Sequence, residues 1–63
     1  MDTITITFED NTVVVTDGRS TDTSYFNKIT DRTQKALIAL ANFYGYEPTE
    51  LFNFDDDTMK ILS

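Results

Sequence analysis

Residues 3–16, TITITFEDNTVVVT, begin as a strict alternation of threonine with apolar side chains and end as a β-branched run. A period of two in β-branched residues is typical of a strand with one buried face. Asp10-Asn11 lies between the two runs, and Asn and Asp tolerate the positive φ angles of tight hairpin turns. The stretch therefore predicts an N-terminal β-hairpin in which Ile4, Ile6 and Phe8 face one side and the threonines face the other.

A loop and one long helix are predicted after the hairpin. Residues 19–24 are all polar, so we expect a loop there. Asp31 has Gln34 three residues later, a variant of the capping box, and Gly45 stands where a left-handed residue ends a helix. Tyr25 and Ile29 would allow an earlier start, near residue 24. The apolar stripe expected on this helix consists of Leu37, Leu40, Ala41 and Tyr44.

The C-terminal residues predict a short helix followed by a short strand. Pro48 suits the first turn of a helix, and Asp55-Asp56-Asp57 is expected to end it. Residues 58–62 would form a strand beside the hairpin, because a lone hairpin is marginal in water; a frayed tail is the alternative. The expected fold is one α+β domain over residues 1–63. It has an N-terminal β-hairpin, extended by residues 58–62 to a three-stranded antiparallel sheet, packed on one long and one short helix.

Composition argues against catalysis. The chain of 63 residues has no His and no Cys, which removes the usual general base, the thiol nucleophile and the common metal ligands. Asp55-Asp56-Asp57 could offer carboxylates to Ca²⁺ or Mg²⁺, but three consecutive residues cannot all face one ion and the EF-hand spacing is absent. We therefore expect no enzyme, no metal and no cofactor. No apolar run is long enough to span a membrane and no signal peptide is evident, so we expect a cytoplasmic protein.

Charge is distributed unevenly along the chain. Residues 1–18 and 47–57 contain acidic residues and no basic ones, whereas residues 19–46 carry Arg19, Lys28, Arg32 and Lys35. The net charge of −6 favours a basic protein partner, such as a nucleic-acid-binding enzyme, and four basic residues are too few for direct nucleic-acid binding. The candidate partner-binding residues are acidic or aromatic: Glu9, Asp10, Phe43, Tyr46, Glu47, Glu50, Asp55, Asp56 and Asp57. Phe43, which lies off the apolar stripe, and Tyr46, in the inter-helix turn, are the aromatics expected to be exposed.

Two resemblances bear on function. Spaced carboxylates can imitate the phosphates of a duplex, and in composition the chain resembles the small acidic anti-restriction and anti-CRISPR proteins of phages. Residues 37–55, LIALANFYGYEPTELFNFD, resemble the C-terminal helices of Cro/C1-type (Xre-like) helix-turn-helix regulators. The matching residues are Leu37, Leu40, Ala41, Gly45, Pro48, Glu50, Leu51 and Phe52. In that family these helices brace the fold or contact a second subunit, so this resemblance allows a homodimer, and no DNA-contacting residue can be carried over from it.

We therefore expect a non-catalytic protein-binding module, in its most concrete form an inhibitor or regulator of a nucleic-acid-handling protein. One alternative is a small regulator-like protein that dimerises through its C-terminal helices. Another is a structural subunit of a larger assembly.

Overall fold

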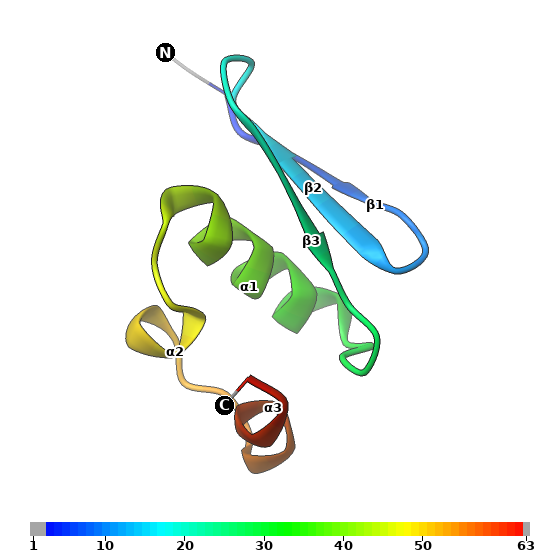
Figure 1. The fold of residues 1–63 in the computed structure, drawn as a ribbon, viewed down its shortest axis with the longest axis vertical. Helices are drawn as coiled ribbons and strands as arrows, with labels where there is room; N and C mark the ends of the chain where they lie inside the picture. The colour runs from blue at the N-terminus through cyan, green and yellow to red at the C-terminus, as the bar shows by residue number, and fades with distance from the viewer. Residues whose placement is uncertain (1–2, 63) are drawn as a thin grey trace.

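The computed structural model describes residues 3–62 and confirms an α+β fold (Figure 1). A three-stranded antiparallel sheet of order β1-β2-β3 is followed by helices, and α1 packs against β2 and β3. The elements are β1 (Thr5–Phe8), β2 (Thr12–Thr16), β3 (Thr21–Tyr25), α1 (Arg32–Tyr44), α2 (Pro48–Leu51) and α3 (Asp56–Leu62).

The predicted hairpin is confirmed, with Phe8 opposite Val13 and Thr5 opposite Thr16. The backbone N–H of Glu9 donates to the carbonyl of Thr12 at 2.9 Å, which leaves Asp10-Asn11 as the turn. Within residues 3–62, however, only the glycines have positive φ, so the tolerance of Asp and Asn for such angles is not used.

The third strand is not the one expected. Residues 58–62, predicted as a strand, lie in α3, and the polar segment predicted as a loop contains β3. β3 pairs with β2 from Thr12↔Tyr25 to Thr16↔Thr21 and so satisfies the backbone groups that face β2, without an apolar face of its own. Its single buried side chain, Ser24, accepts a 3.0 Å hydrogen bond from Asn42 Nδ2 on α1. An edge strand whose inward side chains are polar lacks the alternation of apolar and polar residues that identifies a strand.

α1 begins at Arg32, because the Asp31 carboxylate accepts a 2.9 Å hydrogen bond from the backbone N–H of Gln34. The helix lies between the sheet on one side and α2 and α3 on the other (Figure 1). Its buried residues are Ile38, Ala39 and Ala41, so of the predicted stripe only Ala41 is buried, whereas Leu37 and Leu40 are half-buried and Tyr44 is exposed. The core between sheet and helix consists of Val13, Val15, Phe26, Ile29, Ile38 and Ala39.

Candidate functional site

The turn between α1 and α2 is held by backbone geometry. Gly45 ends α1 in the left-handed region, with φ 81°. The N–H of Gly45 donates to the carbonyl of Asn42 at 3.1 Å, and the N–H of Tyr46 donates to that of Ala41 at 2.9 Å. The chain then enters α2 at the buried Pro48, whose fixed φ suits the first position of a helix. The path of the chain from α1 into α2 is thus fixed.

Large apolar side chains are exposed at this turn beside carboxylates. Tyr44 is 56% exposed, Tyr46 55% and Leu51 48%. Glu47 and Glu50 are exposed beside them, and Glu50 Oε1 accepts a 3.3 Å hydrogen bond from the backbone N–H of Glu47. No basic residue occurs between positions 36 and 59. We call these five residues (Tyr44, Tyr46, Glu47, Glu50 and Leu51) the acidic–aromatic corner.

Phe43 does not belong to this surface. Its side chain is half-buried and packs against the core, so the expectation that it would be exposed is wrong. The reason is that α1 is covered by the sheet on one side and by α2 and α3 on the other, so residues on more than one face of the helix are buried. Tyr44 is exposed instead, and its ring meets that of Phe43 edge to face with centroids 5.1 Å apart.

The three consecutive aspartates have separate roles. Asp55 caps α3: its Oδ1 accepts a 2.9 Å hydrogen bond from the backbone N–H of Thr58. Hydrogen bonding by Thr58 holds the pKa of Asp55 below its ordinary value. Asp56 and Asp57 are exposed in the first turn of α3, where negative charge is favourable. The triplet therefore begins a helix, contrary to the expectation that it would end one.

The remaining acidic candidates lie elsewhere. Glu9 and Asp10 are exposed at the β1–β2 turn, which Figure 1 shows on the opposite side of α1 from α2. The structure therefore does not gather all the predicted acidic residues on one surface. It places Glu47 and Glu50 at α2, Asp56 and Asp57 at α3, and the hairpin acids apart from both.

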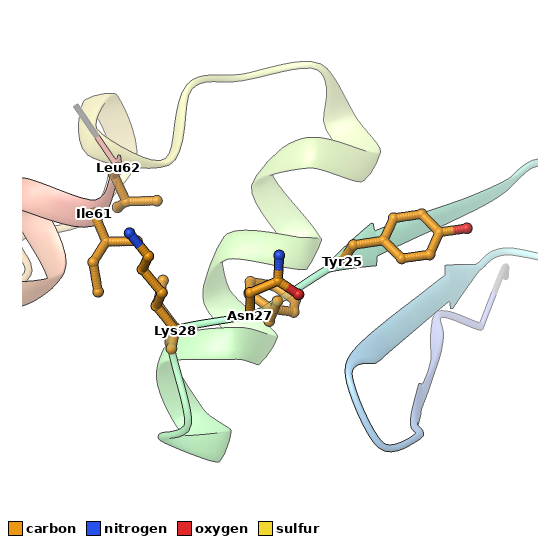
Figure 2. A pocket seen from close by; sticks show the side chains of 7 residues that line it. Tyr25, Asn27, Lys28, Ile61 and Leu62 are labelled. Carbon is orange, nitrogen blue, oxygen red and sulfur yellow. The ribbon is translucent and has the colours of Figure 1, made fainter.

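Basic side chains gather at the opposite end of α1 from the acidic–aromatic corner. The Arg32 guanidinium lies 4.0 Å from the centre of the Phe8 ring, a cation–π contact. Lys28 lines a cavity of about 320 Å³ between the end of β3 and α3, where it extends toward Ile61 and Leu62 while the Tyr25 ring points away (Figure 2). Among residues 3–62, no aspartate or glutamate lines this cavity.

Two further findings concern residues 3–62. They contain no group of three or more acidic side chains placed to hold a metal ion. No helix in this range has the length and hydrophobicity needed to cross a membrane.

The sequence did not single out Tyr44 and Leu51 as surface residues. Tyr44 fits the helical stripe, and its exposure follows from its place in the last turn of α1, next to Gly45. Comparison with known proteins adds no assignment, since no family model, curated protein or solved structure matches this chain.

Proposed function

We propose that this protein is a non-catalytic binding module that holds a basic protein against the acidic–aromatic corner. The observation that carries the proposal is the exposure of Tyr44 and Tyr46 beside two carboxylates, in a stretch without any basic residue. Tyrosine is enriched at binding hot spots, because a large rigid ring with a polar end loses little entropy on binding.

The most concrete form of this proposal is an inhibitor or regulator of a nucleic-acid-handling protein. The groove in which that partner binds nucleic acid would supply the basic residues. The carboxylates of this protein would take the place of phosphates in the groove, and they come from Glu47, Glu50, Asp56 and Asp57. The position of Glu9 and Asp10 across the molecule restricts the contact to the α2 and α3 side. A phage anti-defence role and a cytoplasmic location belong to the same proposal.

The test is a titration against a panel of purified basic DNA- and RNA-binding proteins, with and without competing duplex. E47Q/E50Q removes two charges from the corner, and Gln at position 50 keeps the oxygen that accepts from Glu47. E9Q/D10N removes the same charge from the opposite side and is the matched control. We expect E47Q/E50Q to weaken binding by roughly tenfold, most strongly at low salt, and E9Q/D10N to leave it nearly unchanged. Equal effects of the two variants would contradict the corner as the site.

A second candidate function is self-association of a small regulator through α1 and α2. Leu51, 48% exposed in α2, favours it, because an exposed apolar side chain on a helix is a common dimer contact. The N-terminal half carries a sheet in place of the helix pair that would read DNA in Cro/C1-type proteins. A Leu51→Glu variant that changes the mass in solution without changing the fold would support this candidate.

A further inference from the structure

The two edges of the sheet differ in how they are protected against pairing. β1 and β3 are the edge strands. Asp22 of β3 is paired with the fully buried Val15, so it lies on the core side of its strand, where it is half-buried. An inward-facing charge on an edge strand opposes the addition of another strand, because the carboxylate would lose water. The β3 edge is therefore protected against the addition of another strand.

β1 has no such protection. Residues 3–8 contain no charge, no proline and no glycine, and the register with β2 runs without a bulge from Thr5 to Phe8. α1 packs against β2 and β3, and Figure 1 shows β1 at the margin of the sheet. Natural edge strands usually carry lysine, proline, a bulge or a covering element, and β1 carries none of these within the described residues.

The hydrogen-bonding groups of the free edge can be assigned. Glu9 N–H bonds to the Thr12 carbonyl, and bonding to one neighbour alternates along an antiparallel strand. Thr7 and Thr5 therefore face β2, whereas the N–H and C=O groups of Ile6 and Phe8 point to the open edge. The side chains of Ile4, Ile6 and Phe8 pack against the core but remain half-buried, so the core is incomplete along this edge.

We propose that the β1 edge binds the β1 edge of a second copy of this chain, antiparallel about a two-fold axis at Ile6. In this register Ile6 pairs with its own counterpart, Thr5 faces Thr7 of the second copy, and Ile4 faces Phe8. Each apolar residue meets an apolar one and each threonine a threonine, because the alternation has a period of two. The result is a six-stranded sheet that cannot grow into a fibre, since both of its outer edges are then β3 strands, which are protected against strand addition. A domain of 63 residues gains from such association, because it buries little core alone.

Amide hydrogen exchange gives a direct test. Within one chain the N–H groups of Thr5 and Thr7 are bonded to β2, whereas those of Ile6 and Phe8 are bonded only in the dimer. We expect exchange at Ile6 and Phe8 to slow as protein concentration rises, and sedimentation to show a species of twice 7.2 kDa. Fast exchange at Ile6 and Phe8 and a monomer mass up to about 1 mM would overturn the proposal.

Charge variants locate the contact. T5K/T7K places lysines opposite one another across the proposed axis, and T21K/T23K adds the same charge at exposed positions of β3. We expect T5K/T7K to weaken the dimer by roughly five- to thirtyfold and T21K/T23K to leave it intact or strengthen it. Circular dichroism of both variants verifies that each has folded. Equal effects, or a dimer weakened by E47Q/E50Q or Leu51→Glu instead, would contradict pairing at β1.

Salt distinguishes this contact from the proposed binding of a basic partner. Two copies that each carry a charge of −6 repel one another, so added salt should strengthen the dimer. The same salt should weaken the complex with a basic protein. A dimer that dissociates as salt is added would contradict the uncharged β1 contact.

Discussion

The hydroxyl of Thr58 donates a 2.7 Å hydrogen bond to Oε1 of Gln34, and this bond joins α3 to the first turns of α1. Thr58 is only 4% exposed, so its hydroxyl has little access to water. The bond fixes the C-terminal helix on the body of the domain although the two residues are far apart in sequence.

Thr58→Val should therefore destabilise the protein, because valine keeps the shape of threonine but leaves Gln34 without its donor. We expect a loss of about 1–3 kcal/mol in the free energy of unfolding, measured by urea denaturation. Thr49→Val makes the same change at an exposed position of α2 and serves as the control. Similar losses in the two variants would show that the hydroxyl bond to Gln34 contributes little.

Gly45→Ala should destabilise the end of α1. Gly45 has φ 81°, and a Cβ placed there would meet nothing within 4 Å, so the penalty is conformational rather than steric crowding by neighbours. We expect a loss of about 1 kcal/mol, and a smaller one for Gly45→Asn, since asparagine tolerates this region better than alanine. Thermal unfolding would measure both, and an alanine variant as stable as the wild type would contradict the strain argument.

The contact between Arg32 and Phe8 should appear as a coupling energy. Arg32 stands at the positive end of α1, whose first turn has no acidic residue, so the helix dipole does not favour its charge. A double-mutant cycle with Arg32→Gln and Phe8→Leu separates the ring contact from this dipole effect. We expect a coupling of about 0.5–1 kcal/mol in urea denaturation. The cycle of Lys35→Gln with Phe8→Leu is the control, and equal coupling in both would exclude a specific cation–π contact.

Acid should weaken the fold through Asp55 and Asp17. The pKa of Asp17 is lowered by hydrogen bonds from the backbone N–H groups of Ser20 and Arg19, and that of Asp55 mainly by Thr58. Because each pKa is lower in the folded state, the stabilisation is complete above the ordinary value of 3.8 and is lost as pH falls through the folded-state pKa. D17N and D55N should each flatten the fall in stability between about pH 5 and pH 2.

D10N is the control for this pH series. It removes one carboxylate from the β1–β2 turn, where no hydrogen bond to the Asp10 side chain is found within residues 3–62. We expect its stability to follow the wild-type pH dependence. If D17N, D55N and D10N all change the slope equally, net charge rather than these two hydrogen-bonded carboxylates governs the acid response.

Local signals were sufficient for several elements. The alternation of residues 3–8 predicted β1, and the β-branched run predicted β2, because strand side chains repeat every two residues. Gly45 marked the end of α1 and Pro48 marked the start of α2, because each suits the backbone geometry required at that position, whereas Asp31 was one of two possible starts of α1. Exposed Glu47, Glu50 and Tyr46 were also anticipated, since all three occur in or beside a turn.

Tertiary contacts decided the features of the fold that local sequence patterns could not predict. β3 is a strand because β2 supplies its hydrogen bonds, and no apolar pattern in residues 21–25 predicts it. Residues 58–62 were predicted as a strand, with a frayed tail as the alternative, whereas the Asp55 cap and the Thr58–Gln34 bond hold them in a helix. The partial burial of Phe43 depends on the elements that cover α1 on two sides. Composition and local spacing thus determined the hairpin, the end of α1 and the start of α2, because these depend on neighbours in sequence. Pairing and packing determined the third strand, the last helix and the surface left open for binding, because these depend on residues that meet only when the chain is folded.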